Sequence, residues 1–249
     1  MVYIDKGYIG QFVMSDKTSG SAQLAEYVSQ LQKVGHKHII APINGDTWHS
    51  YRLVSWCNGD PAFPLEPQNP LWYNDIYTDL GFTPIKKYRS DKFGIANIAP
   101  PEPKRGLTVR PFHPDDLPLI YDLSIRGFVD NFLYTPIDYA DFLAIYQPML
   151  PMIANDLLLI AEVDGIAVGF IFAFVAGDKL ILKTMATLPE YRSHGIGSHL
   201  MAQVLATGQA KGIKIAIAAL MSDDNHSHKI VAKYGAEKIR EYTLYTLQG

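Results

Sequence analysis

Residues 107–247 alternate between apolar runs of strand length and stretches with an apolar residue at every third or fourth position. Short turn sequences such as Asp164-Gly165 separate neighbouring runs. The elements that this pattern predicts are, in order, a strand over 107–111, helices to about 130 and over 137–150, strands over 157–163, 166–176 and 180–187, a helix from 196 to 212, a strand over 213–220, a helix from 225 to 235, and one or two strands over 237–247. The order β-α-α-β-β-β-α-β-α-β-β places the second half in the α/β (α+β) class.

The first half has a similar but shorter pattern. The predicted elements are a hairpin within 2–14, a helix with its apolar stripe over 24–34, a strand over 38–43, a helix over 69–80 and a strand over 84–88. This order repeats the later part of the second half, which indicates a divergent internal duplication. The corresponding loop positions are Lys17, Gly20 and Ala22 in the first half and Arg192, Gly195 and Gly197 in the second.

Residues 98–106 are polar and rich in proline, so they cannot continue a helix or a central strand. We interpret them as a linker between a first domain over 1–97 and a second over 107–249. The first half lacks counterparts of the opening strand and helices of the second, so we expect it to be a partial copy.

One turn in the second half has the features of an anion site. A predicted strand ends at Thr187, and Arg192, Gly195 and Gly197 precede a helix with an apolar stripe. Helix N-termini expose unpaired N–H groups with a partial positive charge, and glycines leave room for an anion beside them. The pattern predicts a phosphate or pyrophosphate site, to which Arg192 would add a forked cation. The alternative is an ordinary helix start with two incidental glycines.

The spacing Pro189-x-x-Arg192-x-x-Gly195-x-Gly197, between a strand and a helix, resembles the pyrophosphate loop of the GNAT acetyltransferase superfamily. The order of elements over 107–247 is similar to that of a GNAT domain as well. The resemblance implies a tandem GNAT fold, with a mixed central sheet flanked by helices in the second half and a degenerate, partial GNAT-like first half. It also implies acetyl-CoA as co-substrate.

The resemblance assigns cofactor contacts to two segments and one further residue. In GNAT enzymes the pantetheine arm adds to the edge of the fourth strand of the domain, here Met185, Ala186 and Thr187. The residues that the resemblance places around the pyrophosphate are Arg192, Ser193, His194, Gly195, Ile196, Gly197 and Ser198. Asn225 stands where the family has an Asn that contacts the cofactor, and it would serve as a helix N-cap too.

The catalytic groups stay open at this level. The family often uses the tyrosine of a Tyr-x-x-x-Gly-Phe pattern to protonate the thiolate, but the position four residues before Gly235 holds Val231. The first half keeps the pattern, with Tyr77 as its tyrosine. With valine at this position, the thiolate would receive its proton from water or from a residue of the other half. Candidates for an acid or a base, each with an alternative role in a loop or a cap, are Tyr234, Asp223, Asp224, Glu162 and His226.

The first half contains a long aromatic insertion over 44–52 and 58–70. Loops of this length are often functional, and the insertion would then line an acceptor pocket. Packing between the halves is the equal alternative. The residues concerned are Trp48, His49, Tyr51, Arg52 and Glu66.

Composition narrows the setting. A net charge of −3 provides no basic surface for nucleic acid, and the longest apolar run, 166–177, is too short to span a membrane. The single cysteine, Cys57, excludes an internal disulfide and, with an N-terminus unlike a signal peptide, predicts a cytoplasmic protein. Histidine pairs at 36/38 and 226/228 lack the further ligands of a metal site, so we expect no metal.

Two functions are compatible with these observations. The first is an acetyl-CoA-dependent N-acetyltransferase that modifies a primary amine of a small molecule or peptide. The alternative is a non-catalytic CoA-binding or scaffold protein, which the valine at position 231 favours. A donor with a longer acyl chain is a third hypothesis. The sequence predicts neither the identity of the acceptor nor the oligomeric state.

Overall fold

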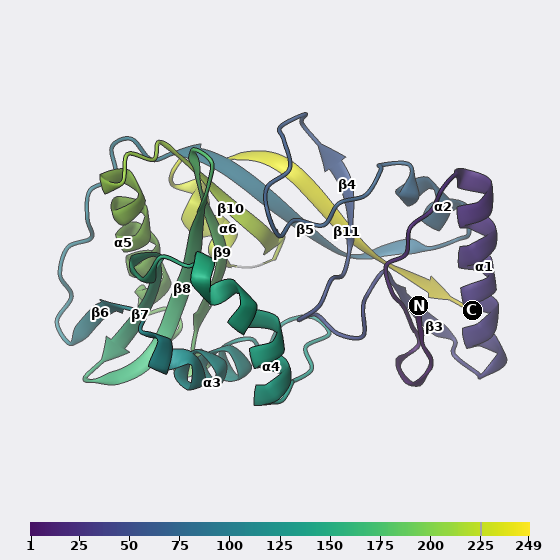
Figure 1. Ribbon diagram of the computed structural model, residues 1–249, viewed down its shortest axis with the longest axis horizontal. Coiled ribbons are helices and arrows are strands. Elements are labelled where there is room, and N and C mark those ends of the chain that lie inside the picture. The colour runs from purple at the N-terminus through teal and green to yellow at the C-terminus, as the bar shows by residue number, and fades with distance from the viewer. Residues whose placement is uncertain (225) are drawn as a thin grey trace. The chain divides into compact units, whose positions relative to one another are not determined.

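The computed structural model describes residues 1–224 and 226–249, with the side chains of all but Met152 and His226 (Figure 1). The chain divides into two compact units. Unit 1 contains residues 1–90, 220–224 and 238–249, and unit 2 contains residues 91–219 and 226–237. Three long strands, β5 (Thr83–Gly94), β10 (Ile215–Ser222) and β11 (Glu237–Gln248), contribute residues to both units. Each unit is described by itself below.

Unit 2 is a mixed sheet flanked by helices. Besides its parts of β5, β10 and β11 it contains β6 (Leu107–Pro111), α3 (Leu117–Gly127), α4 (Tyr139–Tyr146), β7 (Leu158–Val163), β8 (Ile166–Ala176), β9 (Lys179–Thr187), α5 (Ile196–Ala210) and α6 (His226–Ala232). Short 3-10 segments cover Pro114–Asp116, Gln147–Met152, Asn155–Leu157 and Pro189–Tyr191. The strands β6 to β9 pair in sequence order and antiparallel, and β10 joins β9 in parallel.

Helices α3 and α5 cover opposite faces of this sheet. A methyl group on Gly127, at the end of α3, would lie 2.9 Å from Cβ of Ala186. A methyl group on Gly197, in the first turn of α5, would lie 3.5 Å from the side chain of Met185. Since consecutive side chains of a strand point to opposite faces, the two helices lie on either side of β9 (Figure 1). The sheet is thus the middle layer of unit 2.

The elements predicted for the second half are confirmed in kind and order. The predicted helix over 137–150 is shorter: α4 ends at Tyr146 and continues as the 3-10 segment. Pro148 and Pro151 explain this, because proline has no N–H to donate to the preceding turn. The C-terminal pattern forms one strand, β11. The expected mixed sheet flanked by helices is confirmed.

Unit 1 is built around a smaller mixed sheet. Its elements are β1 (Val2–Tyr3), the 3-10 turn Ile4–Lys6, β2 (Tyr8–Ile9), α1 (Lys17–Lys33), β3 (His38–Ala41), β4 (Leu53–Cys57), α2 (Tyr73–Asp79) and its parts of β5, β10 and β11. Strand β11 pairs antiparallel with both β3 and β4. The predicted helix over 69–80 begins only at Tyr73, after Pro70. Strand β4, between the two parts of the aromatic insertion, was not predicted.

Among the described residues, each unit contains a β-α-β connection whose two strands are parallel neighbours. In unit 2 it is β9-α5-β10, and in unit 1 it is β2-α1-β3, where Tyr8 pairs with Ile40. Helix α1 packs its apolar stripe into a core that includes Leu24, Leu31, Ile39 and Tyr77. This core supplies unit 1 with its own buried apolar interior. No helix among residues 1–224 and 226–249 is long and apolar enough to cross a membrane.

Candidate active site in unit 2

The loop between β9 and α5 leaves the first amides of α5 without partners inside the helix. Gly195 is the N-cap, with φ +73°, and no side chain caps the helix. The first backbone hydrogen bond of α5 runs from His199 N to Gly195 O, at 3.1 Å. The amides of residues 195–198 precede this bond, so they converge with the positive end of the helix dipole. A phosphate group fits such a site by its charge and by its acceptor oxygens.

The strand that leads into the loop separates from its neighbour. Strands β9 and β10 pair from Lys179–Ile215 to Leu182–Ala218, and among the described residues of unit 2 this pairing goes no further. The pairing of β9 with β8 skips Lys183, since Ala173 opposes Leu182 and Phe172 opposes Thr184. This β-bulge bends β9 at the point where it leaves β10. Over 185–187 the described residues of unit 2 form no strand pairing on this edge, so an extended ligand can add there.

The guanidinium of Arg192 is bound within the protein. It donates to Asp130 Oδ2 at 2.5 Å, to the carbonyl of Gly127 at 2.8 Å and to that of Thr187 at 3.3 Å. Arg192 therefore joins the end of α3 to the end of β9. These hydrogen bonds indicate that Arg192 supports the loop. The expected direct contact of Arg192 with a phosphate stays a prediction.

A second cation lies closer to the N-terminus of α5. The ammonium group of Lys104, in the segment predicted to be a linker, donates to the carbonyl of His194 at 2.9 Å. A methyl group on Gly195 would lie 2.7 Å from its Nζ. Residues of the linker and of α5 enclose a groove of about 330 Å³, lined by Pro101, Glu102, Pro103, Lys104, Gly195, Ser198 and His199. Burial and the charge of Lys104 lower the pKa of His199, which favours its neutral form.

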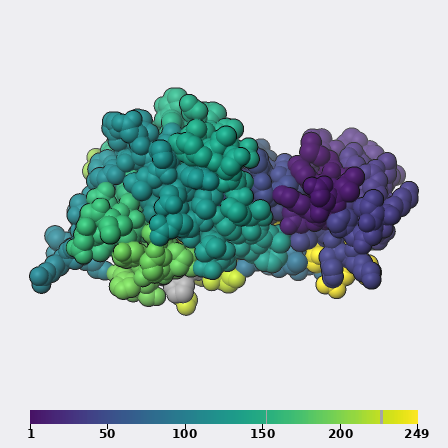
Figure 2. Space-filling model, turned by 90° about the horizontal axis from the view of Figure 1, so that it is seen from below, coloured from purple at the N-terminus to yellow at the C-terminus, as the bar shows by residue number. Residues whose placement is uncertain are grey.

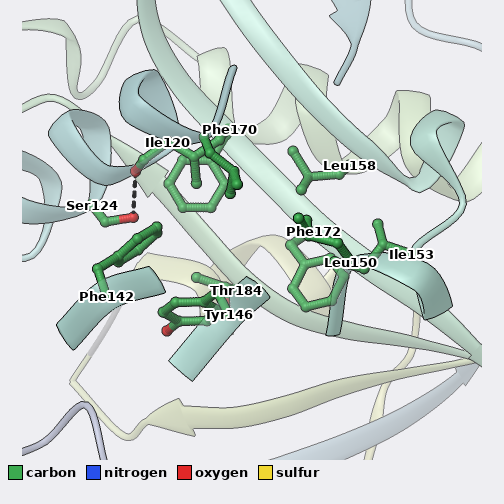
Figure 3. A pocket seen from close by; sticks show the side chains of 11 residues that line it. Ile120, Ser124, Phe142, Tyr146, Leu150, Ile153, Leu158, Phe170, Phe172 and Thr184 are labelled. Carbon is green, nitrogen blue, oxygen red and sulfur yellow. Dashed lines mark hydrogen bonds between the residues drawn. The ribbon is translucent and has the colours of Figure 1, made fainter. Parts of the chain in front are cut away.

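A second cavity lies on the opposite face of the sheet, under α3 and α4 (Figure 3). It reaches β9 at Thr184, next to the segment that separates from β10. Aromatic and aliphatic side chains from α3, α4 and β8 form most of its walls. In the space-filling view, atoms in green and yellow-green, the colours of the later part of the chain, form part of the surface of unit 2 (Figure 2).

Residues 119–236, just under half of the chain, match the Acetyltransferase (GNAT) family. This segment belongs to the GNAT family. It contains the loop, helix α5 and the separating strands, and it lies within the second predicted domain. No curated protein sequence matches the chain.

Solved structures with a similar fold cover most of this chain, including the GNAT segment. A GCN5-related N-acetyltransferase from Sphaerobacter thermophilus is 14% identical, covers 91% of this chain and superposes with a TM-score of 0.64. This chain spans 66% of that protein's length. A tandem GNAT protein from the clavulanic acid biosynthesis pathway is 14% identical, with a TM-score of 0.58, and the match covers 94% of this chain and 71% of that one. A GCN5-related N-acetyltransferase from Kribbella flavida is 15% identical, with a TM-score of 0.54 and coverages of 94% and 77%.

Two of the predicted catalytic candidates in the GNAT segment contact other side chains of the protein. Glu162 accepts from Arg110 Nε at 2.7 Å. Tyr234 stacks on Phe93 with a centroid distance of 5.4 Å, and burial raises its pKa. Asn225 and the side chain of His226 lie outside the described residues. Val231, at the family's tyrosine position, is fully buried. The roles of all these residues stay predictions.

The two neighbouring aspartates follow β10 and belong to unit 1. Asp224 accepts from Lys86 and from Ser222, each at 2.5 Å, and the donation from Lys86 lowers the pKa of its carboxyl. Asp223 is exposed. A general base needs a pKa raised towards neutrality, so the environment of Asp224 favours a structural role.

The N-terminus of α1, which the duplication hypothesis aligns with that of α5, has a different chemistry. Asp16 caps it, with Oδ1 accepting from Ser19 N at 2.9 Å. Lys17 forms an ion pair with Asp75 at 2.7 Å. A carboxylate already fills the position that an anion would occupy, so unit 1 has no equivalent of the α5 site at this helix.

Residues of the aromatic insertion contribute to a buried cluster within unit 1. Arg52, 6% exposed, lies between the rings of Tyr51 and Tyr88, each 4.2 Å from its guanidinium carbon. Glu66 is paired with Arg240 at 3.0 Å. Trp48 and His49 both donate from their backbone amides to Asp46 Oδ1. These contacts are internal to unit 1, so both an acceptor pocket and packing between the halves stay predictions. Within the described part of the chain no group of three His, Cys, Asp or Glu side chains is placed to hold a metal.

Proposed function

We propose that the protein is an acetyl-CoA-dependent N-acetyltransferase that transfers an acetyl group to a primary amine of a small molecule or peptide. One observation carries this proposal: a strand that leaves its parallel neighbour at Leu182 leads into a helix whose first amides, at 195–198, are uncapped. Family membership of residues 119–236 supports the reaction class.

The loop and the linker would bind the nucleotide end of the co-substrate. The amides of 195–198 supply hydrogen bonds to the diphosphate, and the two glycines keep side chains away from it. Lys104 is close enough to these amides to add a positive charge. Arg192 holds the loop in place through Gly127 and Asp130. Two features of the structure suit a diphosphate at this position: the uncapped N-terminus of α5 and the ammonium group of Lys104 beside it.

The free edge of β9 would bind the pantetheine arm. Backbone groups of Met185, Ala186 and Thr187 are available along this edge once β10 has separated. A backbone N–H aimed at the thioester carbonyl stabilises the negative charge that develops on its oxygen. The amine nitrogen attacks the carbonyl carbon and the C–S bond breaks. A base removes a proton from the amine, and the thiolate of CoA receives a proton.

The alternative function is binding of CoA without catalysis. Val231 stands where many family members have a tyrosine that acts as the acid, and a valine side chain has no proton to donate. Water or another residue would then have to protonate the thiolate. Binding of acetyl-CoA without release of CoA, with every amine tested, would favour this alternative.

We also propose that the chain is a tandem GNAT protein. Its first domain, over 1–97, would be degenerate, and its second domain would cover 107–249. The parallel β-α-β connections β2-α1-β3 and β9-α5-β10 support a common origin of the two halves. The carboxylate cap of Asp16 on α1 explains how the first half would have lost a phosphate site. We therefore expect one CoA molecule per chain.

The proposed activity is tested with purified protein, acetyl-CoA and a panel of primary amines. Released CoA is measured with a thiol reagent, and binding is measured separately by calorimetry. We expect binding of one acetyl-CoA per chain and faster CoA release with at least one class of amine. Absence of binding by any CoA ester would contradict both functions.

A further inference from the structure

The cavity under α3 and α4 is lined mainly by apolar side chains. Figure 3 shows Ile120, Phe142, Tyr146, Ile153 and Phe172 around it, with Thr184 of β9 among them. None of the eleven side chains that line it is charged. The Ser124 hydroxyl in its wall already donates to the carbonyl of Ile120, at 2.7 Å. Such a surface favours an uncharged, apolar occupant.

The cavity adjoins the position of the thioester in the proposed function. Thr184 opposes Phe172 of β8 and directly precedes the segment 185–187 that would bind the pantetheine arm. The β-bulge at Lys183 also lies here, where β9 leaves β10. An acyl group on the arm would therefore be within reach of the cavity.

We propose that this cavity binds the hydrocarbon part of the acyl group, and that the preferred donor is a short-chain acyl-CoA longer than acetyl-CoA, such as butyryl-CoA. This inference rests on the proposed function, since it requires CoA to bind along β9.

The charge of the walls decides between the acyl chain and the acceptor amine as the occupant. A primary amine is protonated at neutral pH and would enter this cavity without a carboxylate among the lining side chains. Burial of an unpaired ammonium group is strongly unfavourable. An alkyl chain has no such cost and gains from burial of its methylene groups.

The size of the cavity limits the length of the chain. Its free volume is about 30 Å³. A water-sized group needs about 10 to 15 Å³ by the same measure, so the cavity has room for about two or three such groups. This volume fits the two methylene groups by which butyryl exceeds acetyl, and a chain of eight carbons does not fit.

The experiment measures the affinities of free CoA and of acetyl-, propionyl-, butyryl- and octanoyl-CoA by calorimetry, with no amine present. We expect the affinity to rise about fourfold for each methylene group from acetyl to butyryl. Octanoyl-CoA is expected to bind no better than acetyl-CoA. Equal affinities for all four esters would overturn the inference.

Two variants of the wall test the site itself. Ile153→Phe should fill the cavity and remove the preference for butyryl-CoA, while free CoA binds as before. Leu150→Ala should enlarge it and move the preference to a longer ester. Ile166→Phe is the matched control, because Ile166 is 60% exposed on β8 and outside the cavity. Thermal unfolding verifies that each variant is folded.

The outcomes separate this inference from the proposed function. If free CoA binds and neither wall variant changes the order of the esters, the cavity has another occupant and only the inference fails. If the wild-type protein binds no CoA, the proposed function fails, and the inference with it.

Discussion

Leu182 on β9 and Ala218 on β10 are the last residues at which these parallel strands pair in unit 2. Beyond them β9 bends at its bulge and runs to the loop that precedes α5. Within one β-α-β connection the chain thus provides a free strand edge and an uncapped helix N-terminus. The first suits an extended arm and the second suits a diphosphate, so together they match the two ends of CoA.

Replacement of Gly195 by glutamate should abolish CoA binding. A carboxylate at the N-terminus of α5 would compete for the amides of 195–198 and repel the diphosphate. Juxtaposed like charges cost several kcal/mol, which corresponds to roughly a hundredfold or more in Kd. Calorimetry with acetyl-CoA measures the effect.

Gly212→Glu is the matched control for this variant. Gly195 and Gly212 flank the same helix and both have positive φ, at +73° and +84°, so glutamate strains the backbone at either position. Gly212 has open space around it and is remote in sequence from the loop. Equal loss of binding in both variants would mean that strain, and not the anion site, explains the result.

Lys104→Ala should weaken CoA binding moderately. The ammonium group is exposed, and single exposed charge interactions contribute up to about 1 kcal/mol, or about a fivefold change in Kd. The difference from wild type should shrink as the salt concentration is raised, because salt screens this attraction. Arg105→Ala changes the net charge equally in the same linker but lies outside the groove. Equal effects of the two variants would argue against a specific contact of Lys104.

The loop could be predicted from the sequence because its chemistry is local. Gly195, Gly197 and the apolar stripe of α5 are consecutive in the chain, and the structure forms the helix start where they predict it. The contacts of Arg192 and Lys104 could not be predicted in this way. Two partners of Arg192 are 62 and 65 residues away and the third is across the loop, and Lys104 comes from a segment whose prolines indicate only a linker. Strand β4 was missed because its cross-strand partner, β11, is at the other end of the chain.

In unit 1, Glu66→Gln should destabilise the fold strongly. Glu66 accepts from Tyr242 at 2.5 Å and pairs with Arg240, and both charged side chains are at most 6% exposed. Removing one charge of a buried pair leaves the other unpaired and costs about 3 to 5 kcal/mol. All three tryptophans, at 48, 56 and 72, belong to unit 1, so urea unfolding followed by tryptophan fluorescence reports on this unit.

An exposed ion pair of the same unit provides the comparison. Lys17 and Asp75 have side chains that are 60% and 56% exposed, so Asp75→Asn should change the free energy of unfolding by less than about 1 kcal/mol. The double variant Glu66→Leu with Arg240→Met should recover part of the stability lost in Glu66→Gln, because it also removes the guanidinium that Glu66→Gln leaves unpaired. A Glu66→Gln variant as stable as wild type would contradict the description of this cluster.

In unit 2, Asp116→Asn should lower stability at neutral pH and have little effect in acid. Arg110 donates to both carboxylate oxygens of Asp116, at 2.7 and 2.8 Å, and this donation lowers the pKa of the carboxyl. The stabilisation is present above the unfolded pKa of about 3.9 and is lost as the pH falls through the lower folded value. We expect a loss of about 1 to 2 kcal/mol at pH 7.

Thermal unfolding followed by circular dichroism between pH 7 and pH 2 measures this dependence. Asparagine keeps an acceptor oxygen for the amide of His113, so the variant removes the charge and leaves the turn before α3 in place. A difference between variant and wild type that stays constant with pH would show that the ion pair is not its cause.

The most direct measurement of the central claim is a crystal structure of the protein with acetyl-CoA bound. We predict density for the diphosphate at the amides of residues 195–198, with Lys104 beside it and the pantetheine arm along Met185, Ala186 and Thr187. Density for the diphosphate next to Lys17 at the start of α1, or no bound CoA at saturating concentration, would contradict the account.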